Sequence, residues 1–156
     1  MNVREIMKSE ARFCTPETNL AQAGRTMAEV GCGFLPILTG DKRVEGVVTD
    51  RDICLAVAIR DRKPSEITVR EVMSGEVYSC IEDEEIWEAL HTMRIFGVRR
   101  LVVLDGQGCL RGILSMDDVI LQAKALGDEE FTGPFYSDVA KTLKAICSHP
   151  MPAVVG

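Results

Sequence analysis

The chain has 156 residues, of which 46% are hydrophobic, and a formal net charge of −6. This length suits one ordinary domain or two small units that share a core. The acidic balance argues against a broad phosphate-neutralising face for DNA or RNA. No apolar run reaches the roughly 18 residues of a membrane helix, and the N-terminal MNVREIMKSE lacks the apolar stretch of a secretory signal. We therefore expect a cytoplasmic protein that has neither nucleic acid nor membrane as a partner.

One unit is written twice along the chain, and we take its elements in order. A shift of 66 places aligns residues 3–54 with a second copy without a gap, and 15 of these 52 positions are identical. Chance would give roughly three or four identities at ordinary composition. VREIM falls on VREVM, Gly46 on Gly112, and Asp52 on Asp118. A long period that occurs only twice favours a two-fold pair over a solenoid.

Each copy predicts the element order β-α-β-β-α. A helical turn (VREIM or VREVM) opens it, and an extended segment follows (ARFC or VYSC). Apolar residues at helical spacing then predict a helix that ends at Gly31 or Gly97. FLPIL with VEGVV, and LVVLD with LRGIL, predict a hairpin in each copy. A second helix is expected from Asp52 to Ile59 and from Asp118 to Leu126.

The expected organisation is a first repeat, a polar linker, a second repeat, and a C-terminal helix with a tail. Their ranges are 1–60, 61–68, 69–126 and 127–156. The segment SDVAKTLKAICSH is expected to form one amphipathic helix with Ser137 or Asp138 as its cap. The fold class is α/β in the broad sense (α+β).

Six cysteines are spread widely along the chain, at positions 14, 32, 54, 80, 109 and 147, without a Cys-x-x-Cys pair. An intracellular chain keeps such thiols reduced, and most of them are expected to be small buried hydrophobic residues. Cys147 and His149 are two positions apart, which is a weak indication of a surface metal or thiol site. We predict no metal centre, and a thiol or metal sensor stays open as a third interpretation.

A hydroxyl and a carboxylate stand three residues apart in both copies, as Thr49 with Asp52 and as Ser115 with Asp118. The plain interpretation is a capping box at the start of a helix. The alternative follows from their place after a strand and at a helix start, where backbone N–H groups favour phosphate. A carboxylate there can accept both hydrogens of a ribose diol. Phosphate and ribose chemistry together indicate a nucleotide.

With GVVTDRDI at 46–53 and GILSMDDVI at 112–120, the duplicated unit resembles the CBS domain, named for cystathionine beta-synthase. From residue 3 to about residue 126, the chain resembles a stand-alone tandem CBS pair. This resemblance implies two repeats packed about a pseudo-two-fold axis, with two clefts between them. Such clefts bind AMP, ADP or ATP, and in some members NAD or S-adenosylmethionine. The resemblance also implies a homodimer and a regulated partner protein that the sequence does not identify.

The resemblance also implies a set of ligand-binding positions, in which the Asp of each motif holds the ribose hydroxyls. Phosphate or ribose contacts are expected from Thr49, Arg51, Asp52, Ser115, Asp117 and Asp118. The positions expected along the adenine are Ala11, Arg12, Val77 and Tyr78. Arg99 and Arg100 resemble the phosphate-binding pattern of energy sensors such as the gamma subunit of AMP-activated protein kinase.

The two sites are not expected to be equal. The second copy has Arg99 and Arg100 before its strand, whereas the first copy has Gly-Cys-Gly-Phe and no cation there. Conversely, the first copy has Arg51 where the second has Asp117, and an arginine grips phosphate while an aspartate repels it. In a shared central cleft the three arginines could act on one phosphate. We predict one good mononucleotide site and one poorer or empty site. The alternative for Arg99 and Arg100 is that they are a solvated pair before the strand and bind no phosphate.

No motif for catalysis is present: the sequence lacks Gly-x-Ser-x-Gly, His-Glu-x-x-His and a P-loop. We therefore predict a protein that is not an enzyme and that requires no cofactor. The leading hypothesis is a regulatory ligand-sensing module for an adenine nucleotide. The alternative is a ligand-free oligomerisation or protein-interaction module, in which the hydroxyl–carboxylate pairs are only helix caps.

Overall fold

The computed structural model describes residues 1–126 and 130–148, which form two compact units. Unit 1 contains Met1–Ser9, Tyr78–Val103 and the described residues from Gly112 onward. Unit 2 contains Glu10–Val77 and Leu104–Arg111. The opening segment of each sequence copy therefore belongs to the unit that is built mainly from the other copy.

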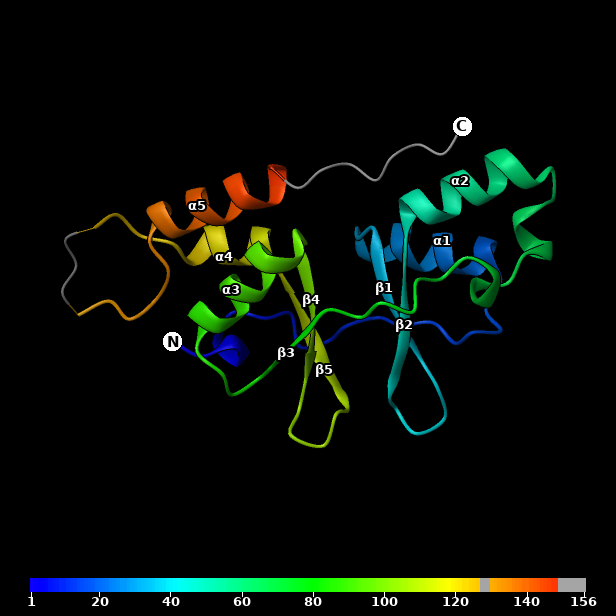
Figure 1. Ribbon diagram of the computed structural model, residues 1–156. Coiled ribbons are helices and arrows are strands. Elements are labelled where there is room, and N and C mark those ends of the chain that lie inside the picture. Colours follow the sequence, from blue (N-terminus) through cyan, green and yellow to red (C-terminus); the bar gives the residue numbers. More distant parts are fainter. Residues whose placement is uncertain (127–129, 149–156) are drawn as a thin grey trace. The chain divides into compact units, whose positions relative to one another are not determined.

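Unit 1 combines a three-stranded sheet with three helices (Figure 1). The order of its strands is β3-β4-β5. Its elements are the 3-10 helix η1 (Val3–Glu5), β3 (Ser79–Ile81), α3 (Ile86–Phe96), β4 (Arg100–Leu104), β5 (Leu110–Ser115), α4 (Met116–Gln122) and α5 (Tyr136–Cys147).

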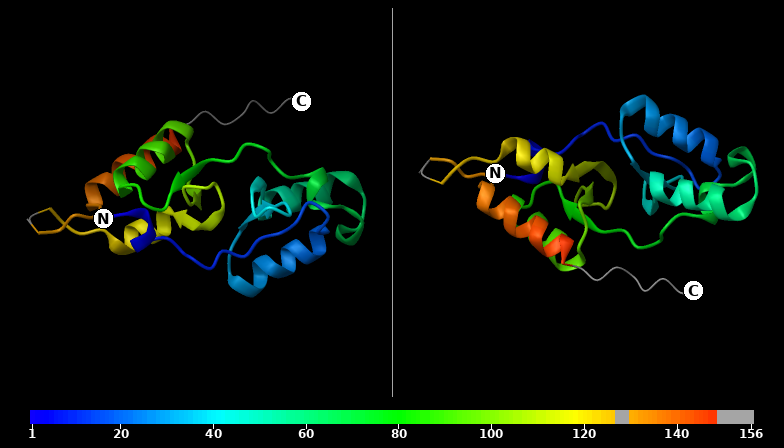
Figure 2. Two further views of the ribbon diagram at one scale, coloured as in Figure 1. Left: turned by 90° about the horizontal axis from the view of Figure 1, so that it is seen from below. Right: turned by 90° about the horizontal axis from the view of Figure 1, so that it is seen from above.

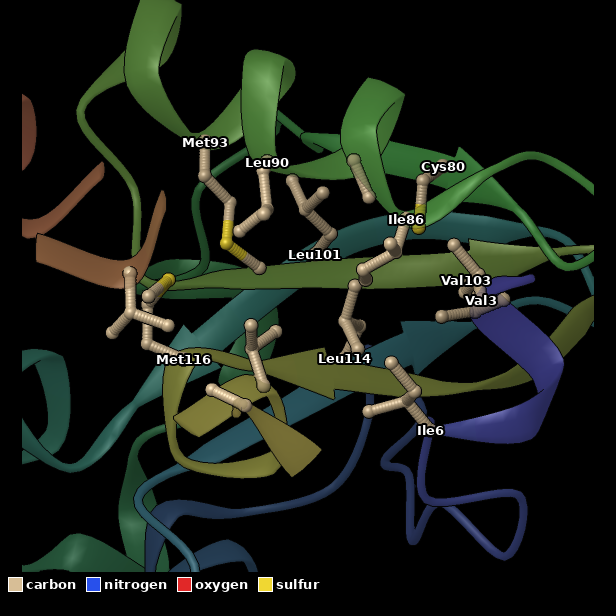
Figure 3. Packing of buried hydrophobic residues seen from close by; sticks show 14 of the residues in the cluster. Val3, Ile6, Cys80, Ile86, Leu90, Met93, Leu101, Val103, Leu114 and Met116 are labelled. Atoms are coloured by element: carbon tan, nitrogen blue, oxygen red, sulfur yellow. The ribbon is translucent and has the colours of Figure 1, made fainter. Parts of the chain in front are cut away.

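The core of unit 1 forms because α3 carries apolar residues three and four positions apart. Ile86, Leu90 and Met93 lie on one face of this helix and are fully buried. Figure 3 shows these side chains directed toward Leu101 of β4 and Leu114 of β5. Burial of such side chains contributes roughly 1.5–3 kcal/mol each, so this face of α3 is a principal stabilising contact of the unit.

Unit 2 is built around a hairpin in which β1 (Phe34–Leu38) pairs antiparallel with β2 (Val44–Thr49). One of its helices (Leu20–Val30) packs Leu20, Ala23 and Met27 against the buried side of this hairpin. The remaining elements are α1 (Leu20–Val30), α2 (Asp50–Arg60) and the 3-10 helices η2 (Pro64–Glu66) and η3 (Val69–Glu71).

The glycines Gly46 and Gly112 leave room for the opening segment of the other copy. In unit 2, the backbone N–H of Val47 donates to the Ser74 carbonyl at 3.0 Å, and the reverse bond is also 3.0 Å. A Cβ at Gly46 would lie only 2.6 Å from that same carbonyl oxygen. In unit 1 a Cβ at Gly112 would collide with the Lys8 carbonyl in the same way. Both positions therefore require glycine because two backbones approach closely there.

The predicted order of helices and hairpins is confirmed in both copies, with corrections at several boundaries. Gly31 and Gly97 end α1 and α3 with φ of 63° and 64°, in the left-handed conformation predicted for a C-cap. The expected first strand of copy 1 is reduced to a single bridge between Cys14 and Ile37. The mixed α/β fold with two small sheets is confirmed.

The predicted starts of the second helix in each copy, at residues 52 and 118, are wrong by two residues. The helices α2 and α4 begin at Asp50 and Met116 because Thr49 and Ser115 are their N-caps. The helix α4 also ends at Gln122 rather than at residue 126. The carboxylates of both motifs therefore lie at the third position of the first turn, and not at its first position.

The C-terminal helix α5 is confirmed, but its N-cap is neither Ser137 nor Asp138. The N-cap is Phe135, whose backbone N–H donates to the carboxylate of Asp138 at 3.1 Å. Figure 2 shows α5 beside α3 in two views, and α5 also contacts α4. The expected tail, residues 149–156, lies outside the described residues. None of the helices in the described ranges is long and apolar enough to cross a membrane.

Candidate functional site

The hydroxyl–carboxylate pairs form complete capping boxes in both units. In unit 2, the Thr49 backbone N–H and hydroxyl donate to Asp52 Oδ2 at 2.8 Å and 2.7 Å, and the Asp52 N–H donates to Thr49 Oγ1 at 3.2 Å. In unit 1, the Ser115 N–H donates to Asp118 Oδ2 at 2.9 Å, and the Asp118 N–H donates to Ser115 Oγ at 3.2 Å. One carboxylate oxygen of each pair thus stabilises a helix start.

The second carboxylate oxygen distinguishes the two motifs. Asp118 is only 7% exposed, and its Oδ1 lies 3.8 Å from the ammonium of Lys8 on the opening segment. Asp52 is partly buried, and within the described residues its Oδ1 has no hydrogen bond or ion pair. Each motif therefore has one carboxylate oxygen committed to the helix cap and a second that is outside the cap.

A cavity of about 250 Å³ in unit 1 joins residues that are far apart in the sequence. Arg100 begins β4 and Arg99 directly precedes it, and the Arg99 carbonyl accepts the Met116 N–H at 3.0 Å, which ties the start of β4 to α4. This bond places both arginines beside the first turn of α4. The cavity is lined by Arg99, Arg100, Ser115, Met116, Asp117 and Leu143.

Four predicted ligand residues thus meet in one place: Arg99, Arg100, Ser115 and Asp117. Both arginines and Asp117 are exposed, so their charged groups are available to a molecule in the cavity. Two guanidinium groups and one carboxylate favour an anion there, since a guanidinium binds phosphate or carboxylate oxygens in pairs. Asp118 and Tyr78 do not line this cavity.

The equivalent place in unit 2 carries a different set of charges, with Asp50 and Arg51 in place of Met116 and Asp117. The Asp50 N–H donates to the Gly33 carbonyl at 3.2 Å, which corresponds to the bond between Met116 and Arg99. The Asp50 carboxylate lies against Gly33, so closely that a Cβ on this glycine would collide with it. Unit 2 therefore has a carboxylate where unit 1 has a guanidinium group. The sequence prediction noted the missing cation but overlooked Asp50.

The positions expected along the adenine are divided between the units. Ala11, Arg12 and Val77 belong to unit 2, whereas Tyr78 belongs to unit 1. The Tyr78 ring packs on Phe96 at the end of α3, with 4.7 Å between the ring centroids. Arg12 forms an ion pair of 3.9 Å with Glu29. Their use by a ligand stays a prediction, as does the shared phosphate of Arg51, Arg99 and Arg100.

A second cavity, of about 420 Å³, was not predicted from the sequence. It lies in unit 2 beside the turn of the β1–β2 hairpin, away from Thr49 and Asp52. Arg70 at its edge already pairs with Glu17 at 2.8 Å and with Glu45 at 3.6 Å. This hydrogen bond to Arg70 holds the pKa of Glu17 below its usual range. The walls of this cavity are mainly apolar, and the charge of Arg70 at its edge is balanced by Glu17 and Glu45. The residues that line it form no catalytic arrangement.

The cysteines form no disulfide, and all six lie in the described ranges. Burial raises the pKa of Cys14 to about 11 and that of Cys80 to about 12, so both are protonated thiols near neutral pH. Within residues 1–126 and 130–148, no three His, Cys, Asp or Glu side chains are grouped to hold a metal ion. His149, named above with Cys147, lies outside the described residues.

Comparison with known families adds to this geometry. The sequence profile of the CBS domain matches residues 3–59 and again residues 69–124. The chain belongs to the CBS domain family. The two matches coincide with the two sequence copies, so this CBS chain is a tandem pair. It spans 61% of the length of a Methanopyrus kandleri relative, which is 30% identical over 120 residues and 77% of this chain.

Three solved structures are similar to this CBS pair. Hypoxic Response Protein I with two coordinated zinc ions is 28% identical, with a TM-score of 0.71 over 80% of this chain and 100% of that one. The CBS pair of protein MJ0100, solved with 5-methylthioadenosine and S-adenosylmethionine, is 21% identical, with a TM-score of 0.69 over 78% of this chain and 94% of that one. CBSX2 in complex with AMP is 23% identical, with a TM-score of 0.65 over 77% and 93%.

Proposed function

We propose that this CBS pair is a regulatory module that binds an adenine nucleotide and places the phosphate end against Arg99 and Arg100. The observation that carries the proposal is the cavity in unit 1 that both arginines line together with Ser115 and Asp117. Structures similar to this chain contain AMP, 5-methylthioadenosine or S-adenosylmethionine, which all include adenosine. AMP, ADP and ATP are the proposed ligands because the two arginines suit a phosphate.

The charge and size of the cavity support the phosphate assignment. Each guanidinium presents five N–H donors and binds phosphate oxygens in a bidentate manner. The volume of about 250 Å³ is below the roughly 300–1,000 Å³ of pockets that hold a whole ligand. This cavity therefore suits one end of a nucleotide, and the net charge of its side chains selects the phosphate end.

The proposed ribose acceptor is Asp118, through the carboxylate oxygen outside the helix cap. That oxygen lies near Lys8 in an ion pair of 3.8 Å, which is too long for a direct hydrogen bond. Ribose hydroxyls can therefore donate hydrogen bonds to this oxygen, while the other carboxylate oxygen keeps its capping bonds. Asp52 is the equivalent acceptor in unit 2, and we propose a weaker site there because Asp50 repels phosphate.

The test is calorimetric titration of the nucleotide-stripped protein with adenosine, AMP, ADP, ATP, NADH and S-adenosylmethionine. We expect micromolar binding of one phosphate-bearing nucleotide, near one site per chain. Arg100→Glu should weaken AMP and ATP far more than adenosine. Arg25→Glu, at an exposed position on α1 of unit 2, is the matched charge reversal and should leave binding unchanged. Equal losses for AMP and adenosine in Arg100→Glu would remove the phosphate role.

A second candidate function is a ligand-free oligomerisation or protein-interaction module. Its support is that both capping boxes are complete without a ligand, and that large apolar side chains on helices are exposed, such as Ile59 at 76% and Leu121 at 81%. Exposed apolar side chains mark interaction sites where they gather into a patch, and we propose that these side chains form a homodimer interface for either function. No binding heat from any nucleotide, together with a folded dimer in sedimentation velocity, would favour this candidate.

The proposed role is regulatory and not catalytic, with a client protein that responds to the bound nucleotide. Coupling of this kind requires that the nucleotide binds two states of the module with different affinities. The six unpaired cysteines support a reducing, cytoplasmic location. Hydrogen exchange with and without AMP would identify the helices that respond. Uniform protection across both units would argue against a regulatory response.

A further inference from the structure

The C-terminal helix α5 has no counterpart after the first sequence copy. It packs on unit 1, which contains the cavity lined by Arg99 and Arg100, called the arginine cavity below. Val139, Thr142 and Ile146 are buried on one face of this helix. Arg94 of α3 donates to the Thr142 hydroxyl at 3.2 Å. Figures 1 and 2 show α5 running along α3, and it also contacts α4. The position of α5 is therefore fixed by a buried face and by a side-chain hydrogen bond.

One residue of α5 lines the arginine cavity, and a second contacts one of its arginines. Leu143 packs partly against the core of unit 1 and also lines the cavity. Cys147 lies one turn further along α5, and its sulfur contacts the Arg99 guanidinium at 4.0 Å. Residues four apart lie on the same side of a helix, so one side of α5 forms a wall of the cavity and touches one of its cations.

We infer that Leu143 is a specificity-determining residue that limits the length of the phosphate chain beside Arg99 and Arg100. This inference rests on the proposed nucleotide function. A monophosphate requires only the two guanidinium groups. A longer chain brings further anionic oxygens toward the apolar Leu143 and toward the Asp117 carboxylate, and neither can donate a hydrogen bond to them. Polar groups without such partners lower affinity. The wall therefore favours AMP over ATP.

The direct test is the ratio of the dissociation constants for ATP and AMP, measured by calorimetry. For the wild type we expect tighter binding of AMP. Leu143→Ala opens the wall, so this ratio should fall by on the order of tenfold, as expected for a change of a few methylene groups in a pocket. Leu143→Phe narrows the cavity, so the ratio should rise. An unchanged ratio in both variants would overturn the inference.

The matched control is Ile146→Ala, because Ile146 lies on the same helix and packs in the same core but does not line the cavity. Ile146→Ala should keep the wild-type ratio. An equal shift in Ile146→Ala would show that loosening of α5 causes the effect, and this would overturn the role of Leu143. Circular dichroism checks the fold of each variant. If Leu143→Ala fails to fold, Leu143→Phe and Leu143→Met carry the test, and Leu143→Met should retain the ratio.

The proposed function and this inference fail in different ways. If the wild type binds no adenine nucleotide, the proposed function fails and the inference fails with it. If the wild type binds nucleotides but prefers ATP, or if the ratio does not respond to Leu143, the nucleotide function stands and only the inference is lost.

Discussion

Replacement of Gly112 by alanine is expected to destabilise unit 1, because the opening segment of the chain crosses β5 at this glycine. The backbones of Lys8 and Ile113 exchange hydrogen bonds of 2.9 Å and 3.0 Å. A Cβ on Gly112 would collide with the Lys8 carbonyl oxygen and lie 3.1 Å from the Met7 sulfur. The atom in the way belongs to the Lys8 backbone and not to a flexible side chain, so the whole opening segment has to move. Movement would weaken both hydrogen bonds and displace Val3 from the core.

The magnitude follows from these contacts. Each lost hydrogen bond costs about 0.5–1.5 kcal/mol, and forcing a methyl group into a packed contact costs about 1–3 kcal/mol. Alanine also restricts the unfolded chain more than glycine does, and this offsets the lost free energy of unfolding by about 0.4–1 kcal/mol. We therefore expect the free energy of unfolding to fall by about 1–5 kcal/mol, which is a large part of the roughly 5–15 kcal/mol typical of a folded domain.

The assay is urea unfolding, followed by circular dichroism. The matched control is Gly24→Ala in the middle of α1, where a Cβ would meet no atom within 4 Å. Alanine at such a helix position should stabilise by about 0.5–1 kcal/mol. Gly46→Ala is the equivalent test in unit 2 and should also destabilise. A urea midpoint for Gly112→Ala at or above that of the wild type would refute the reasoning from the crossing segment.

Further predictions concern the motifs and the thiols. Asp118→Ala should lower the free energy of unfolding by about 0.5–2 kcal/mol through the lost cap and abolish AMP binding in calorimetry. Asp52→Ala should weaken AMP binding less. A larger loss of binding in Asp52→Ala than in Asp118→Ala would contradict the unequal sites. Asp50→Asn should strengthen phosphate binding in unit 2, seen as a second AMP per chain. Between pH 9.0 and about 11 or 12, Cys14 and Cys80 hold their protons only in the folded state, so stability in urea unfolding should fall as pH rises; constant stability would contradict their burial.

The sequence predicted the elements well because their signals are local. Helical spacing of apolar residues, a glycine at each helix end and two short apolar runs separated by a turn identified α1, α3 and both hairpins. The predicted starts of α2 and α4 are two residues late, because Thr49 and Ser115 are the N-caps and the helices begin directly after them.

The site was predictable where the residues resemble the family's motifs and where the two copies could be compared. The Arg99–Arg100 pair and Asp117 were expected from this resemblance, the first copy lacks all three, and the structure places them on one cavity. Leu143 lies outside the duplication, and its distance along the chain from Arg99 gave no local signal. The contact of Asp50 with Gly33 was missed for another reason: it depends on how β1 and α2 meet in three dimensions.

The two copies agree where the fold demands it and differ at the positions proposed to meet a phosphate. Gly46 and Gly112 are identical because each must admit a crossing backbone, and the methionine beside each glycine is also the same in both copies. Gly33 and Arg99 differ, although both accept the first N–H of the following helix. Only the backbone carbonyl at this position holds the helix start, so its side chain can differ between the copies: in unit 2 the Asp50 carboxylate lies against a glycine, and in unit 1 the position carries a guanidinium group. Duplication thus kept one architecture and allowed the charge of the two sites to diverge.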